Sequence, residues 1–210
     1  MTAEGCWRRA DSRSPTAGVR PRTLAEVFAY AEAEGIRRRI DGAETQVRRP
    51  KTNRPGRRAF VSGKRKQNTI KTTIISDGQG RLVWSGADRP GLMHDQTAMR
   101  TEGIAEQLRL HSKLTAEVDE GYRGLANELP DQVSAPPKKP KNDAPLREQY
   151  AWRERRRRQS SDRICVEHAN VELRQWRPLQ RCTGRREDYA EAHRVIASLV
   201  SEVVILSAER

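Results

Sequence analysis

The sequence predicts a mixed α/β fold built around one modest core. Candidate strands dominate the first half and candidate helices the second, with one helix between two strands, an order typical of mixed α/β domains. The 210 residues suffice for one domain with an appendage, yet only two Phe, four Tyr and four Trp can contribute to its core. An excess of 41 Lys and Arg over 28 Asp and Glu, a formal charge of +13, implies wide basic surfaces.

The chain begins with a stretch rich in Arg, Ser, Pro and Gly, residues 1–22, which is expected to be a mobile basic arm. A helix is predicted next, over about 23–34. Thr23 and Glu26 form a capping box at its start, and Gly35 is a natural stop.

Strand signals follow this helix. Residues 36–41 are typical of a strand, which 46–49 continues after a turn, and a basic Pro/Gly loop occupies 50–58. Residues 70–76 and 81–85, joined by a D-G-Q-G turn, predict a β-hairpin.

The second half predicts a helix over 94–108 and a strand over 114–119, whose alternation places Asp119 at the end of the polar face. Residues 136–160 are a Pro/Lys segment and then an Arg run, expected to be a solvated connector or a nucleic-acid-binding insertion. Two helices, over about 161–176 and 187–206, close the chain. Their expected buried sides are Val166, Ala169, Leu173 and Trp176 in the first, and Tyr189, Ala192, Val195, Ile196, Leu199, Val200 and Val203 in the second.

The net positive charge indicates a polyanionic partner, with nucleic acid ahead of a membrane surface. No apolar run approaches the roughly 18 residues that span a bilayer, and the first residues lack the apolar segment of a signal peptide. The three cysteines form no C-x-x-C pair, which fits a reducing compartment. We therefore expect a soluble, cytoplasmic protein.

One polar stripe on the predicted helix over 161–176 carries a carboxylate between two cations. Arg163, Glu167, Asn170 and Arg174 lie within about 60° of one another at the helical period. An ordinary surface pair between Arg163 and Glu167 explains this pattern on its own, and the pattern alone favours that explanation.

Five ordered blocks carry a stronger signal. They are IDGAETQVRRP, SGKRKQNTIKTTIISDGQGRLVWSG, DRPGLMHDQT, LTAEVDEGYRGL and RICVEHANVELRQWRPLQR. Together, over about residues 23–200, they resemble the motif blocks of bacterial insertion-sequence transposases of the DDE class, which are related to the Harbinger-type elements. The resemblance implies a ribonuclease H-like fold for one catalytic domain, residues 23–206, and a catalytic triad of Asp41, Asp119 and Glu167.

The implied chemistry suits these residue types. Cleavage and transfer of a phosphodiester need an activated nucleophile and a stabilised leaving oxygen, which two Mg²⁺ ions (or Mn²⁺) can supply together. Hard cations prefer carboxylate oxygens. The resemblance therefore implies that Asp41 and Asp119 bind the metals and that Glu167 completes one metal site.

Asp95 is the rival for the second carboxylate, because G-L-M-H-D also resembles a family block. Its position just before a predicted helix favours an N-cap role, so Asp119 is preferred. His94 is an auxiliary candidate that either approaches substrate phosphate or is structural.

The family often carries a Tyr, Arg, Glu, Lys signature on its last catalytic helix. Here Arg163 and Glu167 match it, Ser160 stands in the place of Tyr, and Arg174 replaces Lys while keeping the charge. The DNA-contact candidates are Lys64, Arg65, Lys66, Lys71, Arg123, Arg163 and Arg174. For the four residues in 64–71 a basic, merely solvated hairpin is the alternative. The Arg run and the Lys cluster within 136–160 are weaker candidates, because charge is their only feature.

Relatives of this kind usually place a helix-turn-helix region before the first catalytic Asp, but only 40 residues precede Asp41. We expect that module to be absent here, or to lie on a separate upstream polypeptide. Two hypotheses remain: a metal-dependent transposase catalytic domain, and a truncated or domesticated remnant that only binds DNA non-specifically. The implied partners are element ends and target DNA, together with further copies of the chain assembled on DNA.

Overall fold

A computed structural model describes residues 23–200 apart from 34, 36, 50–55 and 79, and within 162–169 it describes only the backbone. The predicted mobile arm over 1–22 lies outside the described residues, as do most of the basic loop at 50–58 and Val203 of the last helix. In the part of the chain that is described, no helix is long and apolar enough to span a bilayer.

A mixed sheet forms the middle layer, and it confirms the predicted α/β class. Its strand order is β3-β2-β1-β5-β6, in which β1, β2 and β3 run antiparallel and β5 and β6 lie parallel to β1. The strands are β1 (Arg38–Val47), β2 (Thr69–Ser76), β3 (Leu82–Ser85), β4 (Arg89–Pro90), β5 (Ala116–Val118), β6 (Val133–Ser134) and β7 (Arg181–Cys182). Two short strands lie outside this order: β4 pairs with β2, and β7 pairs with the far end of β1. This arrangement agrees with the ribonuclease H-like fold that the motif blocks imply.

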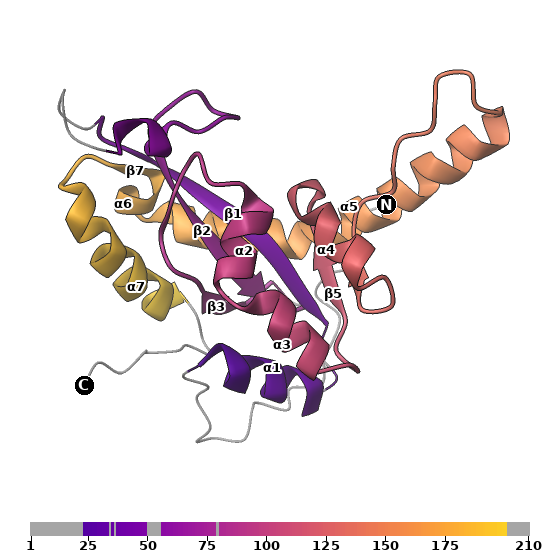
Figure 1. Cartoon of the computed structure of the whole chain (residues 1–210), viewed down its shortest axis with the longest axis horizontal. Helices are drawn as coiled ribbons and strands as arrows, with labels where there is room; N and C mark the ends of the chain where they lie inside the picture. The colour runs from indigo at the N-terminus through magenta and orange to yellow at the C-terminus, as the bar shows by residue number, and fades with distance from the viewer. Residues whose placement is uncertain (1–22, 34, 36, 50–55, 79, 201–210) are drawn as a thin grey trace.

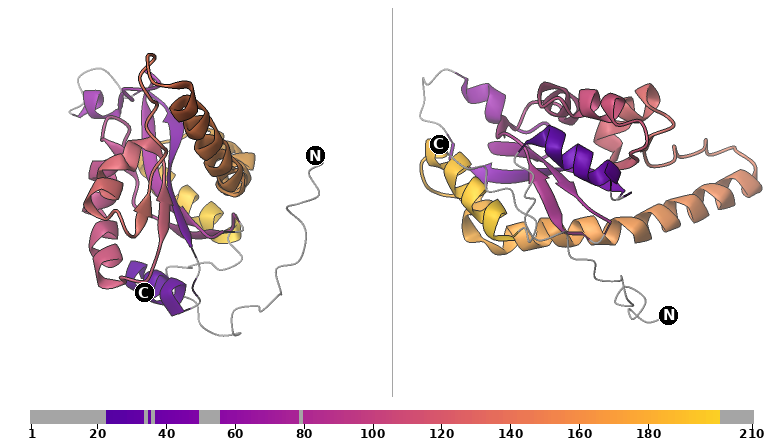
Figure 2. Two further views of the ribbon diagram at one scale, coloured as in Figure 1. Left: turned by 90° about the vertical axis from the view of Figure 1, so that its right-hand side faces the viewer. Right: turned by 90° about the horizontal axis from the view of Figure 1, so that it is seen from below.

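Helices cover both faces of the sheet (Figures 1 and 2). They are α1 (Leu24–Ala33), α2 (Asp95–Thr101), α3 (Ile104–Leu110), α4 (Arg123–Glu128), α5 (Leu146–Gln175), α6 (Arg177–Gln180) and α7 (Tyr189–Val200), with short 3₁₀ turns at Arg57–Phe60, Glu120–Tyr122 and Arg186–Asp188. Because alternate residues of a strand face opposite sides, β1 contributes to two cores. Ile40 packs with α1 to α4, and Val47 packs with α5, α6 and α7.

Local signals explain several boundaries. The Glu26 amide donates to Thr23 Oγ1 at 3.2 Å, as the capping box predicts, and Gly35 after the helix has φ of +62°. The single helix expected over 94–108 is instead two, because Gly103 adopts φ of +76° between α2 and α3. A positive φ breaks the right-handed helical path, and glycine adopts it without a steric penalty.

The largest departure from the sequence prediction is α5. The predicted connector over 136–160 is helical from Leu146 onward, so the Arg run and the candidate catalytic residue Glu167 share one 30-residue helix. Strand β1 is likewise continuous rather than two segments around a turn.

The predicted buried sides of the last two helices are partly wrong. Leu173 is buried as expected, but Trp176 is 42% exposed. On α7, Tyr189 and Ile196 are buried, whereas Val195 and Leu199 are exposed and His193 occupies the inner face instead. His193 points inward because Ser85 and Asp88 lie within reach of its two ring nitrogens, each at 3.4 Å.

Candidate active site

Two carboxylates end neighbouring parallel strands. Ile40 of β1 pairs with Val118 of β5, so Asp41 and Asp119, one position further along, follow at the same level of the sheet. Strand alternation turns the Asp41 side chain to the α5 face, where Asn170 contacts it, and predicts the same side for Asp119, since Ile40 and Val118 pack in the core on the other face. Adjacent strands lie about 4.8 Å apart, so this register brings the two residues close together.

A buried ion pair holds this register. Glu117 is on the same face as Asp119 and directly opposite Arg39. Its two oxygens accept from Arg39 Nε at 3.0 Å and from Arg37 at 2.8 Å. Arg39 and Glu117 are both buried, so a slip of β5 along β1 would leave their charges without partners inside the protein.

Two hydrogen bonds orient the Asp41 carboxylate, one from the next residue and one from α5. Its Oδ1 accepts from the Gly42 amide at 2.8 Å, and its Oδ2 accepts from Asn170 Nδ2 on α5 at 2.7 Å. The second contact ties the helix to the strand directly over the first carboxylate.

Glu167 lies three residues before Asn170 on α5, which is close to one helical turn. Its side chain, like that of Arg163, lies outside the described part of the structure. Among the described residues no group of three or more His, Cys, Asp or Glu forms a metal site. The residue types nevertheless suit a hard cation, because Asp41 and Asp119 follow paired residues of neighbouring strands and both carry carboxylate oxygens.

Asp95 does not have the role that its sequence position suggests. The N-cap of α2 is His94, whose Nδ1 accepts from the Gln96 amide at 3.4 Å, so the predicted N-cap role of Asp95 is wrong. Asp95 instead forms an ion pair with Lys71 Nζ at 2.7 Å, and that ammonium also donates to the Met93 carbonyl at 2.9 Å.

The Asp95 carboxylate packs closely against the backbone of Gly121 and lies near that of Gly42. A Cβ at Gly121 would lie 2.6 Å from Asp95 Oδ2, and one at Gly42 would lie 3.7 Å from Oδ1. Asp95 therefore approaches from α2, on the face opposite to the one covered by α5. It neighbours the Asp41 and Asp119 site without sharing its face.

Tyr122 of the D-x-G-Y-x-G block fills the space beneath this site. Its hydroxyl would be 3.0 Å from a Cβ at Gly42, which explains why a residue without a side chain follows Asp41. Burial raises the pKa of Tyr122 well above its usual value, and the charges of Asp95 and Asp41 raise it further. The phenol is therefore neutral beside the aspartates.

A buried acid lies behind the same strands. The Glu102 side chain is 3% exposed, with Arg89 Nε 3.9 Å away. It takes the space over Gly86, where a Cβ would be 2.4 Å from Oε2. Burial raises the pKa of Glu102 to about 7, against the opposing effects of Thr73 and Arg89.

The DNA-contact candidates whose side chains the structure describes fall into three groups. Lys64, Arg65 and Lys66 form the exposed tip of a tight turn that the Ser62 amide closes on the Gln67 carbonyl at 2.8 Å. At this tip Arg65 Nε also lies 3.5 Å from a Glu44 oxygen.

The second group is already engaged within the protein. Lys71 is bound by Asp95, and Arg123 pairs with Glu120 while donating to the Pro136 carbonyl at 2.6 Å. The third group is Arg174 alone, which is exposed in the last turn of α5.

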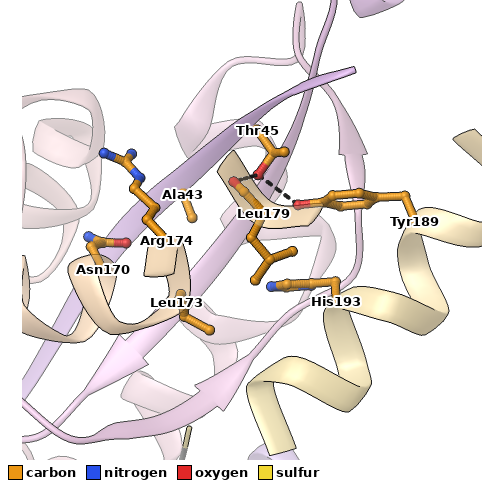
Figure 3. A pocket seen from close by; sticks show the side chains of 8 residues that line it. All are labelled: Ala43, Thr45, Asn170, Leu173, Arg174, Leu179, Tyr189 and His193. Atoms are coloured by element: carbon orange, nitrogen blue, oxygen red, sulfur yellow. Dashed lines mark hydrogen bonds between the residues drawn. The ribbon is translucent and has the colours of Figure 1, made fainter. Parts of the chain in front are cut away.

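A small cavity of about 10 Å³, enough for one water, lies between β1, α5, α6 and α7 (Figure 3). Asn170 and Arg174 line one end. At the other end Tyr189 donates to Thr45 Oγ1 at 2.8 Å, and Thr45 donates to the Leu179 carbonyl at 3.0 Å. These bonds fix α6 and α7 against β1, next to the helix that carries Asn170.

Sequence reasoning did not assign a role at the site to Asn170 or Tyr122. Asn170 shares the polar stripe of Glu167, so its spacing was the available signal. Tyr122 shares a block with Asp119, but nothing in the sequence indicates that its hydroxyl reaches Gly42.

Comparisons with known proteins give two matches. A family described as DDE superfamily endonuclease matches residues 40–207. A protein of Microchaete diplosiphon described as a probable transposase for insertion sequence element IS702 is 28% identical over 135 residues. These residues are 64% of this chain and 45% of that protein, so the chain matches less than half of the relative's length. No solved structure gives a significant match.

Proposed function

The chain belongs to the DDE superfamily endonucleases, as its motif blocks predicted, and from that premise we propose that it is the catalytic domain of an insertion-sequence transposase. The proposed reaction is metal-dependent cleavage of DNA strands followed by strand transfer. The observation that supports the proposal is the parallel register of β1 and β5, in which Ile40 and Val118, the residues before Asp41 and Asp119, are paired.

We propose that Asp41, Asp119 and Glu167 hold Mg²⁺ or Mn²⁺. When bound, such ions activate the attacking oxygen and stabilise the leaving one. The support within this chain is the pair of adjacent carboxylates and the position of Glu167 one turn before Asn170.

The other residues of the site have binding and orienting roles in this proposal. Asn170 donates to one oxygen of the Asp41 carboxylate and so fixes its orientation. The exposed cations Lys64, Arg65 and Lys66 contact the DNA backbone, which gives affinity without reading base sequence. Asp95 remains neutralised by Lys71 and supports the site from behind.

The experiment is a nicking assay of the purified full chain on supercoiled plasmid, with Mg²⁺, with Mn²⁺ and with a chelator. We expect metal-dependent nicking that Asp119→Asn and Glu167→Gln each abolish. Asp131→Asn, at an exposed aspartate of a distant loop, is the matched control and should cleave normally. Cleavage that survives Asp119→Asn would refute the assignment.

The same assay distinguishes a catalytic domain from the alternative, a remnant that binds DNA without catalysis. A protein that binds DNA tightly but nicks it with neither metal would support the remnant hypothesis. We further propose that the active form is an assembly of several copies on DNA in the bacterial cytoplasm. A separate proposal concerns the element ends: a helix-turn-helix module, on this protein or on a separate polypeptide, recognises them.

A further inference from the structure

The N-terminal half of α5 is a helix with no core of its own. Across residues 146–161 no side chain is buried, and only Gln149, Trp152 and Gln159 are even partly covered. Figures 1 and 2 show this half of α5 extending beyond the sheet and the other helices. At 1.5 Å per residue it offers about 24 Å of exposed helix.

This half helix is strongly and unevenly charged. It contains six arginines and two glutamates, and among the described residues only Arg158 forms an ion pair, with Glu154 Oε1 at 3.2 Å. Arg153 and Arg157 are four residues apart on one face, so their charges repel each other in the free protein. A partner with closely spaced negative charges would remove that repulsion.

One face of the helix is free for such a partner. Arg147, Tyr150, Arg153 and Arg157 follow one another at spacings of three, three and four residues, which aligns them on one side. Tyr150 is 62% exposed, and the Arg153 guanidinium lies 5.4 Å from the centre of its ring. We call this set of four residues the arm face.

The returning loop holds the helix at Trp152, on the side away from the arm face, and at Gln149, one turn before Arg153. Trp152 Nε1 donates to the Pro137 carbonyl at 3.1 Å, and Gln149 Nε2 donates to the Ala144 carbonyl at 2.8 Å. The loop therefore fixes the rotation of the helix and leaves the arm face outward. Because α5 is continuous, that face also has a fixed position relative to Asn170 and the Asp41 carboxylate.

We propose that the arm face is a docking surface for double-stranded DNA, contacting the phosphates of a duplex that extends away from the carboxylate site. Duplex DNA carries one negative charge per about 1.7 Å, and the arm is long enough to follow about seven base pairs. The identity of the ligand as DNA rests on the proposed function, but the docking itself is measured without catalysis.

The test is binding of the full chain to a labelled 30-base-pair DNA duplex by fluorescence anisotropy, in chelator, over a range of salt concentrations. The arm variant replaces Arg147, Arg153 and Arg157 with Gln, a residue of similar helix propensity. The matched control replaces Arg177, Arg181 and Arg185 with Gln, because these arginines are also exposed, form no ion pair with a described residue, and lie beyond the C-terminal end of α5. Both variants lose three positive charges.

We expect the arm variant to raise the Kd for duplex DNA at least about tenfold at 0.1 M salt, and to reduce the slope of log K against log salt by about 2 to 3. The control should change the Kd less than about twofold. Replacing the three arm arginines with Lys preserves charge and should restore binding, which separates charge from any loss of helix.

The proposal is overturned if both variants weaken binding equally, if the arm variant binds like the wild type, or if it loses affinity for duplex RNA alone. Failure of the proposed function would look different. In that case the wild type would bind DNA through the arm face and yet show no metal-dependent nicking.

Discussion

Asn170 Nδ2 donates a 2.7 Å hydrogen bond to Asp41 Oδ2, and this contact joins α5 to β1 across 129 positions of sequence. It brings a side chain of the last catalytic block against the carboxylate of the first. The hydrogen bond also restricts the rotation of the carboxylate, whose other oxygen is held by the Gly42 amide. The geometry of the site therefore depends on how α5 docks on the sheet.

Replacing Asn170 with Ala should reduce metal-dependent nicking about 10- to 100-fold, because a hydrogen bond to a charged group contributes about 1.5–3 kcal/mol. The rate should be measured against Mg²⁺ concentration, since a misoriented Asp41 raises the concentration needed for half-maximal rate. Glu172→Ala, at an exposed position of the same helix, is the control. An unchanged metal dependence in Asn170→Ala would contradict an orienting role.

Divalent metal should stabilise the folded protein through the adjacent carboxylates. At a concentration ten times its Kd, Mg²⁺ contributes about 1.4 kcal/mol, which for a chain of this size raises Tm by about 3–6 °C. Thermal unfolding with and without Mg²⁺ measures the shift. Asp41→Asn should abolish it, and a shift of equal size in that variant would place the metal elsewhere.

Gly121→Ala should disturb Asp95 and its ion pair with Lys71. The new Cβ would lie 2.6 Å from Asp95 Oδ2, so the carboxylate must rotate away. We expect a loss of about 1–2 kcal/mol in the free energy of unfolding, measured by urea titration. Gly184→Ala is the matched control, because a Cβ there meets nothing within 4 Å. Equal losses in the two variants would show that the space around Asp95 accommodates the added methyl group.

Glu102 should make the stability of the protein depend on pH. Its pKa is raised by burial from 4.5 to about 7, so the folded state holds a proton that the unfolded state has released. The stabilising effect of this proton is complete below pH 4.5, declines as the pH rises, and is lost above about pH 7. The change amounts to about 3 kcal/mol.

Glu102→Gln isolates this effect, because glutamine fills the same space without titrating. The variant should be more stable than the wild type at pH 8, and the difference should shrink toward pH 5. Urea unfolding at several pH values measures it. Parallel stability curves for the two proteins would show that Glu102 does not titrate in this range.

Much of the fold was predictable from local patterns. The period of two over residues 114–118 placed Leu114, Ala116 and Val118 on the buried face, and the capping box at Thr23 marked the start of α1. The hairpin of β2 and β3 followed from its D-G-Q-G turn, where Asp77 accepts from the Arg81 amide at 2.9 Å. In each case the decisive contacts lie within a few residues of one another.

The site was predictable in part. The motif blocks singled out Asp41 and Asp119, and the described structure sets them at the same level of neighbouring strands. The N-cap role expected for Asp95 was wrong, because capping is decided by which side chain reaches the first free amides. His94 occupies that position, while Lys71 from β2 draws Asp95 away.

The sequence by itself determined the α/β class, the family and the chemical character of the site, since strand alternation and motif order are properties of the chain. Tertiary structure decided where α5 begins and what it touches. Repulsion within the Arg run disfavours a helix locally, and the bonds from Trp152 and Gln149 to the returning loop oppose that tendency. The same docking brings Asn170 to Asp41, a contact that no local pattern encodes because its partners meet only after the sheet and helix have packed.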